Sequence, residues 1–588
     1  MYKIQILYTL ITMIAIILVS LPLKVRAGEN PEKTKMQKKA GINRIITESY
    51  DESLAAHCHN GTFVGQADGA VLSFKGIPYA EPPVGRLRWK NPVLVSDREG
   101  VYEAKYFGKS PIQTEWFSEV GSYYLKGEDC LNLNVWVNIQ DSSKEKTVMV
   151  FFHGGSFGWG GTSDPLYDGH NLVEKFPDII LVTVGYRTGI MGFIDFSSVP
   201  GGEDYATSGN LGLLDQVCAL KWIQKNIKAF GGNPDNVTIF GESAGGGSVS
   251  LLPLIEGTKG LFRRIIAESG SVCQSYSRRE SRYLTQMLLK NSKCSNMEEL
   301  MALSEEELMN LNEDLNDSNN FPLRDGIVLP EELYSAWENP DLADIDFMTG
   351  TNKDELRYWI RELGYDVPVL PNLLAYKLQM PIAYENVMKK MSAEEKELTD
   401  RFMQLQSGEK IWKITEFYNE LLFRVPALEQ AIRHKGKSYN YYWTMPGADK
   451  TLGSCHAVEL AYVFNNPQAD LYTGGLYDEK LADITQNMWV NFARIGDPGT
   501  DEYAWEPYTS ENRKTMVLGQ EIGMTTDLMQ EQQELIKPLL HHYFNGCYVD
   551  LDYNVPFLWK TAVKIAGVFA MIIAMICGVV IKGRKKNK

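Results

Sequence analysis

The most constraining feature of this chain is a serine between glycines, placed directly after an apolar run. Residues 237–240 (Val-Thr-Ile-Phe) predict a buried strand, and residues 241–245 read Gly-Glu-Ser-Ala-Gly. The small residues that follow predict a helix. A strand that turns this sharply into a helix leaves little room for side chains at the glycines, and the turn lifts the serine hydroxyl above the sheet edge. The pattern predicts that Ser243 is a nucleophile beside the positive end of a helix.

Apolar runs separated by helical stretches predict an α/β fold with a large, mostly parallel central sheet flanked by helices. Helical stretches such as 214–226 and 283–290 lie between several of the runs, and segments 276–340 and 375–435 are expected to be helical insertions. A composition of 44% hydrophobic and 23% charged residues is ordinary for a folded chain of 588 residues. The strands are expected at residues 148–152, 179–184, 237–240, 263–267, 346–349 and 439–445.

A second glycine-rich turn follows an earlier predicted strand. His153, Gly154 and Gly155 come directly after the apolar run 148–152. Glycines leave backbone N–H groups uncovered, so Gly154 and Gly155, together with the N–H of Ala244, are predicted to form an oxyanion hole. His153 is expected to hold this turn in place and not to act as a general base.

Four further motifs carry a resemblance to a known family. They are residues 74–83 (FKGIPYAEPP), 128–135 (EDCLNLNV), 209–216 (GNLGLLDQ) and 230–234 (FGGNP). With the serine turn, they resemble the type-B carboxylesterase and cholinesterase family. The resemblance implies an α/β-hydrolase fold, hydrolysis of small-molecule carboxylic esters through an acyl-enzyme, and a Ser-Glu-His triad. It implies no metal and no cofactor.

The resemblance also assigns the remaining site residues. The triad acid maps to Glu355 in the motif 350–355 (GTNKDE), and the triad histidine maps to His456 in the motif 453–460 (GSCHAVEL). The neighbouring Asp354 is the main alternative for the acid. Ser269 matches a serine that lies behind the acid in the family. The order serine, acid, histidine along the chain is the order that this fold requires.

Other positions bear on the structure and on the substrate. Arg88 and Glu128 resemble a structural ion pair of the family. Val120 stands where the cholinesterases carry a tryptophan that binds a quaternary ammonium, so the sequence favours a general carboxylesterase. Ala457 stands where cholinesterase-like members have glycine, a change expected to be tolerated. The tryptophans Trp116, Trp159 and Trp359, with Phe157, are either pocket walls or core aromatics.

The two ends of the chain predict a membrane location. Residues 1–27 are expected to be a signal peptide or an uncleaved N-terminal anchor, and residues 28–43 a polar linker before the catalytic domain at 44–548. Residues 549–560 are expected to be a juxtamembrane linker, 561–581 a transmembrane helix and 582–588 a basic cytoplasmic tail. We therefore expect a single-pass protein of the cell membrane with its catalytic domain on the non-cytoplasmic side.

The charge and the histidines outside the triad carry less information. The chain has 59 basic and 74 acidic residues, a net charge of −15 that disfavours nucleic-acid binding. His57 and His59 flank Cys58 without a second ligand cluster in the sequence, so no metal site is predicted there. His541 and His542 are adjacent and are expected to point in different directions from a helix, as part of a solvated face.

Eight cysteines are too few for a disulfide scaffold, although single bridges fit the sequence. Cys58, Cys130, Cys273 and Cys294 lie in turn-rich surroundings, and a bridge between Cys273 and Cys294 would close a short loop. The family's usual partner of Cys130 is replaced near Pro111, and Cys58 is a substitute candidate. The sequence leaves the pairing and the oligomeric state open.

Two other functions remain as alternatives to an esterase. Some relatives keep the fold and a C-terminal membrane helix without the nucleophile, and they act as cell-surface adhesion or binding proteins. This chain retains Ser243, Glu355 and His456, which a binding module has no physical need to keep. A lipase with a mobile lid is the third candidate.

Overall fold

A computed structural model describes residues 41–113, 125–140, 145–315, 320–361, 369–467, 476–544, 549–550 and 555–556. The predicted signal or anchor segment 1–27 and the predicted transmembrane helix and tail at 561–588 lie outside these residues. Val120 and Trp116 also lie outside them. Among the described residues, every helix is too short or too polar to cross a membrane.

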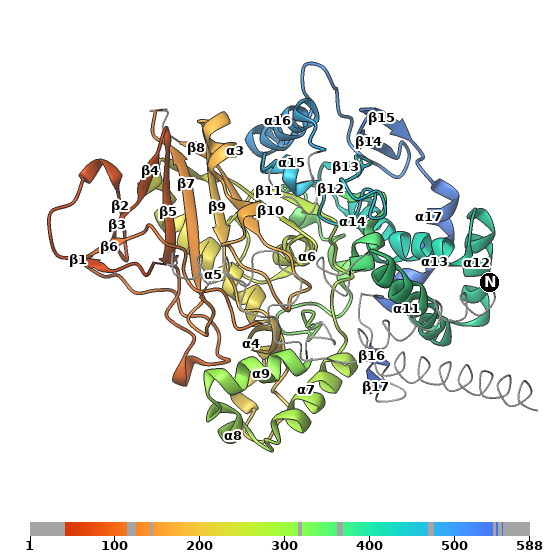
Figure 1. The fold of residues 1–588 in the computed structure, drawn as a ribbon, viewed down its shortest axis with the longest axis horizontal. Helices are drawn as coiled ribbons and strands as arrows, with labels where there is room; N and C mark the ends of the chain where they lie inside the picture. The colour runs from red at the N-terminus through yellow and green to blue at the C-terminus, as the bar shows by residue number, and fades with distance from the viewer. Residues whose placement is uncertain are drawn as a thin grey trace, which may run out of the picture.

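The molecule is organised around one large twisted sheet (Figure 1). Its seven central strands, from β9 to β14, pair in parallel, and antiparallel strands complete both edges. In spatial order, the strands are β15 (Gly523–Thr526), β14 (Lys514–Leu518), β13 (Ser438–Trp443), β12 (Asp346–Asn352), β11 (Arg264–Glu268), β10 (Gly232–Glu242), β8 (Lys146–Phe152), β9 (Ile179–Val184), β7 (Asn132–Asn138), β5 (Val71–Pro78) and β4 (Gln66–Asp68).

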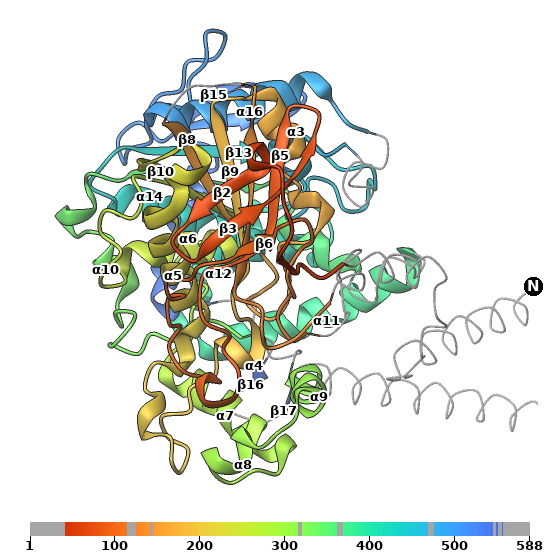
Figure 2. The same ribbon diagram turned by 90° about the vertical axis from the view of Figure 1, so that its left-hand side faces the viewer.

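All six strands that the apolar runs predict are present in the parallel part of the sheet. Every residue of β8 and β9 is buried, because helices cover both faces of a parallel sheet and leave no face for water. The antiparallel strands β5 and β7 and the parallel strand β14 were not predicted. A smaller sheet lies beside β5 of the large sheet (Figure 2). Its strands, in spatial order, are β1 (Ile45–Ile46), β6 (Val101–Glu103), β3 (Gly61–Val64) and β2 (Ala55–Cys58).

Helices cover the sheet and form the two predicted insertions. The helices packed on the sheet are α3 (His170–Lys175), α5 (Leu211–Asn226), α6 (Ala244–Leu251), α14 (Val425–Arg433) and α16 (Glu479–Ile495). The first insertion holds α7 (Arg278–Ser292), α8 (Met297–Met301), α9 (Glu305–Leu315) and α10 (Leu333–Ala336). The second insertion holds α11 (Val369–Lys390), α12 (Ala393–Leu405) and α13 (Lys410–Asn419), on the far side of the sheet from α3 (Figure 1).

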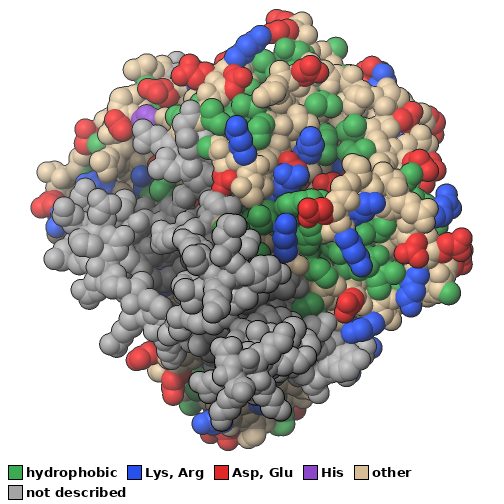
Figure 3. Space-filling model, turned by 45° about the vertical axis from the view of Figure 1, so that its right-hand side comes forward, with side chains coloured by type: hydrophobic (Ala, Val, Ile, Leu, Met, Phe, Trp, Pro, Cys, Tyr) green, Lys and Arg blue, Asp and Glu red, His purple; other side chains and the backbone are tan. Residues whose placement is uncertain are grey.

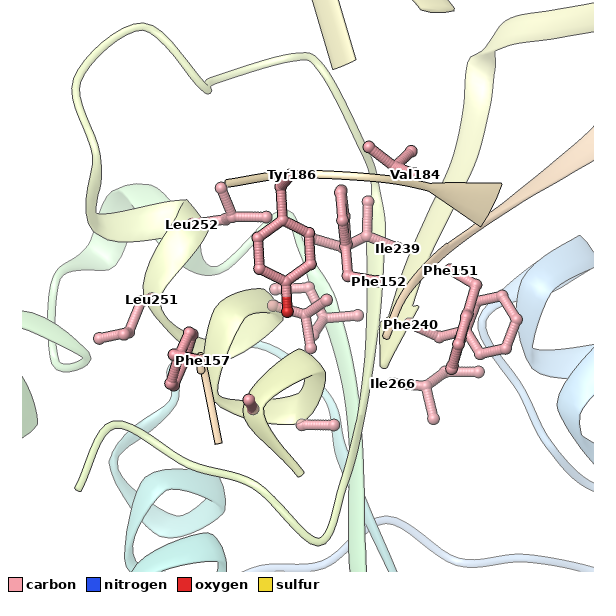
Figure 4. Close-up of a cluster of buried hydrophobic side chains, with 14 of the residues drawn as sticks. Phe151, Phe152, Phe157, Val184, Tyr186, Ile239, Phe240, Leu251, Leu252 and Ile266 are labelled. Atoms are coloured by element: carbon pink, nitrogen blue, oxygen red, sulfur yellow. The ribbon is translucent and has the colours of Figure 1, made fainter. Parts of the chain in front are cut away.

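The strands β8 and β10 meet α6 in a dense apolar cluster (Figure 4). Phe151 and Phe240 lie with their ring centroids 5.0 Å apart, and Phe464 packs edge-on against Phe151 at the same centroid distance. Aromatic pairs at this spacing add to the free energy gained from burial. The cluster therefore fixes the ends of β8 and β10, from which both glycine-rich turns leave the sheet.

A bidentate ion pair joins Arg88, which follows β5, to Glu128, which precedes β7. Both guanidinium nitrogens Nε and Nη2 of Arg88 lie 2.6 Å from the Glu128 carboxylate. Nη1 of Arg88 donates to the carbonyls of Met301 and Leu303, in the first helical insertion. Since both side chains are buried, we infer that the pair holds these segments in register and that loss of one partner would leave a buried charge.

The six described cysteines are all free thiols, so the expectation of a disulfide fails for this part of the chain. Cys273 precedes α7 and Cys294 follows it. A helix of 15 residues is about 22 Å long, whereas disulfide partners need Cα atoms within about 7 Å. The helix therefore keeps Cys273 and Cys294 apart, although the loop between them is short in sequence. Cys58 and Cys130 are also unpaired.

The surface carries both signs of charge. Figure 3 shows lysine and arginine side chains interspersed with acidic and hydrophobic ones on one face of the molecule. Mixed charge of this kind is typical of a solvated protein surface and produces no extended basic field for nucleic acid.

Candidate active site

Ser243 lies at the tip of the turn between β10 and α6. Its backbone has φ 58° and ψ −119°, a conformation that residues other than glycine rarely adopt. A Cβ added to Gly245 would collide with the carbonyl oxygen of Phe152 on β8, and one added to Gly241 would lie 2.6 Å from that same oxygen. The glycines of the motif are therefore required by the close approach of β8 and α6.

The crowding at Gly245 leads to a stability prediction. We expect Gly245→Ala to lower the free energy of unfolding by about 3 kcal/mol, because the added methyl group forces the elbow away from β8. Gly523→Ala is the matched control, since nothing lies within 4 Å of its added Cβ, and a change within about 0.5 kcal/mol is expected. Urea denaturation measures both values. Equal stabilities for the two variants would contradict this account of the elbow.

The turn after β8 lies directly against the elbow. A Cβ added to Gly154 would be 3.1 Å from the Ser243 Cβ, and Gly155 has φ +105°. In the described chain, no backbone carbonyl accepts a hydrogen bond from the N–H groups of Gly154, Gly155 or Ala244. Unused N–H groups beside a serine hydroxyl are suited to bind developing negative charge on a substrate oxygen.

His153 is buried behind this turn. Its ring stacks on Tyr186 with centroids 4.4 Å apart, and its Nδ1 lies 2.8 Å from the carbonyl oxygen of Gly154. Burial lowers the pKa of His153 to about 4, so the ring is neutral at pH 7. These contacts agree with a residue that holds the glycine turn in place.

The acid and the histidine predicted from the sequence meet in the structure. Nδ1 of His456 lies 2.5 Å from Oε2 of Glu355, and both side chains are buried. The other carboxylate oxygen of Glu355, Oε1, accepts hydrogen bonds from the Ser269 hydroxyl at 2.6 Å and from the backbone N–H of Asn352 at 2.7 Å. Three donors therefore fix the carboxylate, and Ser269 lies behind it as the family resemblance implies.

Asp354, the alternative acid, is occupied elsewhere. Its Oδ2 accepts a hydrogen bond from the N–H of Ser454 at 3.0 Å, and its Oδ1 pairs with Arg357 at 2.9 Å. These contacts tie the loop after β12 to the loop that carries His456. Geometry therefore favours Glu355 over Asp354 as the partner of the imidazole.

A buried carboxylate that sequence reasoning missed faces the second imidazole nitrogen. Oε1 of Glu242, the residue before the nucleophile candidate, lies 3.1 Å from Nε2 of His456, without hydrogen-bond geometry. Burial raises the pKa of Glu242 well above its usual value, and the nearby carboxylates of Glu459 and Glu355 raise it further. The sequence offered one indication of this contact, because Glu242 lies inside the serine motif and directly before Ser243.

Comparisons with known proteins identify the family of this chain. The model of the carboxylesterase family matches residues 52–536. The chain belongs to the carboxylesterase family. It is 33% identical over 522 residues to the para-nitrobenzyl esterase of Bacillus subtilis (strain 168), an alignment that covers 84% of this chain and 99% of that relative. It is 32% identical over 498 residues to the cholinesterase of Mus musculus, covering 77% of this chain and 80% of that protein.

A solved carboxylesterase confirms the predicted fold class. The crystal structure of a Geobacillus stearothermophilus carboxylesterase superposes with a TM-score of 0.73 at 29% identity, covering 82% of this chain and 99% of that one. The chain is therefore an α/β hydrolase with a large, mostly parallel sheet. As a member of the carboxylesterase family it is a serine hydrolase of carboxylic esters.

Aromatic rings surround the histidine of this carboxylesterase. The rings of Phe423, Trp359 and Tyr358 lie with centroids 5.0, 5.3 and 6.0 Å from the His456 ring. Trp359 is thus beside the site, whereas Phe157 is fully buried against Phe193 and belongs to the core. An apolar surround excludes water from the imidazole and strengthens its interaction with Glu355.

Ala457, which follows the histidine, adopts a conformation that favours glycine. Its φ is +66°, and its side chain is buried. A left-handed backbone costs an alanine about 1 kcal/mol relative to glycine. The sequence comparison with cholinesterases thus identified a position at which the backbone is strained, beside the predicted general base.

Proposed function

We propose that Ser243, His456 and Glu355 form the catalytic triad of this esterase. The contact that carries the proposal is the 2.5 Å approach of the Glu355 carboxylate to Nδ1 of His456. A carboxylate there keeps the proton on Nδ1, so Nε2 presents a lone pair. Oε1 of Glu242, the neighbour of Ser243, lies 3.1 Å from this nitrogen, so Nε2 faces the segment that carries the nucleophile candidate.

In the proposed reaction, Ser243 Oγ attacks the carbonyl carbon of the ester and its proton passes to Nε2 of His456. The tetrahedral intermediate then collapses, its bond to the alcohol oxygen breaks, and His456 returns the proton to the leaving alcohol. Water, deprotonated by the same imidazole, attacks the acyl-enzyme and releases the acid and the free serine. Glu355 stabilises the imidazolium in both steps and stays ionised.

The oxyanion of each tetrahedral intermediate is proposed to bind the N–H groups of Gly154, Gly155 and Ala244. Each such donor contributes about 3 kcal/mol to transition-state stabilisation. The unused N–H groups and the short approach of Gly154 to Ser243 support this assignment. The hydrogen bond from Ser243 Oγ to His456 Nε2 is expected to form when substrate binds, since catalytic hydrogen bonds commonly tighten in the complex.

We propose further that the substrates are neutral esters and not choline esters. The support is Val120, which replaces the tryptophan that a quaternary ammonium would contact. Purified protein is expected to hydrolyse p-nitrophenyl acetate and butyrate, and to hydrolyse butyrylcholine at least about tenfold more slowly. Protein inactivated with a fluorophosphonate is the blank. Preferential hydrolysis of the choline ester would reject the substrate proposal, and failure on every ester would reject the triad.

We also propose a location. Residues 561–581 would span a membrane, with the basic residues 582–588 in the cytoplasm, and residues 1–27 would direct the catalytic domain at 44–548 to the other side. Removal of 561–588 is expected to move esterase activity from the membrane fraction to the soluble fraction. Removal of 582–588 alone is the control and is expected to leave it in the membrane. Activity that stays with the membrane in both truncations would contradict the anchor.

A further inference from the structure

A cluster of two histidines and one glutamate shares no residue with the proposed triad and lies where the end of the catalytic domain meets the second insertion. Glu395 belongs to the first turn of α12, and His541 and His542 end the 3₁₀ segment Lys537–His542 that follows α17 (Gln530–Ile536). Helices α12 and α17 lie side by side (Figure 1). The cluster therefore joins two segments that lie 147 residues apart in the chain.

The two adjacent histidines do not diverge as the sequence suggested. Their ring centroids are only 4.0 Å apart, because the 3₁₀ segment ends at His542 and Tyr543 turns into a left-handed conformation. Nε2 of His542 lies 2.9 Å from Oε1 of Glu395, and Nε2 of His541 lies 3.4 Å from the same oxygen. Both imidazoles therefore point one nitrogen at a single carboxylate oxygen.

Hydrogen bonds outside the cluster orient its ligand atoms. Oε2 of Glu395 accepts from the N–H of Ser392 at 2.7 Å as part of the helix capping box, which leaves Oε1 for the imidazoles. Nδ1 of His541 lies 2.9 Å from the carbonyl oxygen of Pro538, so it must carry a proton. In a neutral ring, Nε2 of His541 then directs a lone pair at the Glu395 carboxylate. Two electron-rich atoms that face each other across 3.4 Å require either a metal ion or a second proton on the ring to bring them together.

We propose that Glu395, His541 and His542 bind a first-row divalent metal ion, for which Zn²⁺ is the best match. Zn²⁺ prefers imidazole nitrogen and carboxylate oxygen at about 2.0–2.2 Å, which places tetrahedral ligand atoms about 3.3 Å apart. The distances of 2.9 and 3.4 Å lie on either side of this value, and all three donor atoms lie within 4.8 Å of one another. Water completes the coordination.

The solvent exposure of the cluster and the hydrogen bonds made by its ligands also fit a metal site. The side chain of His541 is 64% exposed, so an ion reaches the site from solvent, whereas Glu395 is 13% exposed and firmly held. The backbone carbonyl of Pro538 and the N–H of Ser392 act on the histidine and the carboxylate as outer contacts commonly do at metal sites. An ion bound here stabilises the folded state, because the unfolded chain does not bring these ligands together.

Zinc binding to the purified full-length chain tests the proposal. We expect isothermal titration with ZnCl₂ to show one site that is lost, or weakened at least about tenfold, in His541→Ala, His542→Ala and Glu395→Gln. Zn²⁺ is also expected to raise the Tm of the wild type by about 2 °C or more, and to leave the Tm of the variants unchanged. Glu395→Gln retains the capping box, since glutamine serves at that position too, so it removes the ligand charge without breaking the helix cap.

His57→Ala is the matched control for zinc binding. His57 also pairs with a glutamate, at 2.5 Å from Glu52, but among the described residues it belongs to no group of three potential metal ligands, so zinc binding should not change. Fluorophosphonate labelling verifies that each variant is folded. Zinc affinities in all three ligand variants equal to the wild type would overturn the proposal. A wild-type Tm that does not respond to Zn²⁺ would overturn it as well. In that case protonated histidines would pair with Glu395 and join α12 to the segment Lys537–His542 without a metal ion.

Discussion

Replacing Ser243 by alanine is expected to lower kcat for p-nitrophenyl butyrate by about 10⁴- to 10⁶-fold. Alanine removes the oxygen that we propose forms the acyl-enzyme, and the residual rate is then expected to come only from the oxyanion donors and substrate binding. Because the elbow is formed by backbone crowding around its glycines and not by the serine hydroxyl, the variant is expected to fold. Initial rates at saturating substrate measure the effect, and the same variant should not react with a fluorophosphonate.

Ser250→Ala is the matched control for this prediction. Ser250 lies on the same helix α6, is fully buried, and its hydroxyl has no hydrogen-bond partner in the described chain. Its removal is therefore expected to change kcat less than about twofold and stability by less than about 1 kcal/mol. A Ser243→Ala variant that is folded and retains more than about 1% of wild-type kcat would assign the nucleophile to another residue.

Six of the seven strands in the parallel part of the sheet could be predicted, because their signal is local, whereas β14 was missed. Strands such as β8 and β9 are continuous apolar runs of buried residues, and glycine-rich turns mark where they end. The antiparallel strand β7 (Asn132–Asn138) was missed because polar asparagines interrupt its apolar pattern, although all its residues are buried. Asn134 donates to the hydroxyl of Thr183 on β9, a long-range contact that no local pattern reveals.

The site was predicted in part, and the limit has a physical cause. Family motifs identified Glu355 and His456, which the structure brings within 2.5 Å of each other. No sequence rule indicated that Glu242 faces the same imidazole, or that burial raises the pKa of Glu459 to about 7, with Glu355 adding to the effect. Such contacts depend on how separate loops close over the sheet. The convergence of His541 and His542 was missed for the same reason, since it requires Glu395 from α12.

The two buried carboxyl groups beside the imidazole of His456, those of Glu355 and Glu242, differ in their hydrogen bonds. Glu355 accepts hydrogen bonds from Ser269, Asn352 and His456, and these donors hold its carboxylate in one orientation. Glu242 has a raised pKa, and its Oε1 has no hydrogen-bond partner in the described chain. We infer that Glu355 is the carboxylate that stabilises an imidazolium, while burial disfavours the charged form of Glu242.

Replacing Glu355 by glutamine is expected to lower kcat by about 10³- to 10⁴-fold. The cause is a change in which nitrogen of His456 carries the proton, and not a loss of packing. The argument follows from the donors on the carboxylate. Ser269 Oγ and the N–H of Asn352 both donate to Oε1, so the amide oxygen of a glutamine must take that side. Its NH₂ group then faces Nδ1 of His456, which must accept a hydrogen bond. The proton moves to Nε2, and the imidazole no longer accepts the proton of Ser243.

Asp354→Asn is the matched control, because it changes the adjacent acid by the same single atom. An asparagine oxygen can still accept from the Ser454 N–H, while the pair with Arg357 is lost. We expect kcat within about tenfold of the wild type for this variant, and an unchanged KM in both variants, since neither acid binds the ester. If Glu355→Gln retained more than about a tenth of kcat while Asp354→Asn lost activity, the acid of the triad would be Asp354, and the loop after β12 would have to rearrange to present it.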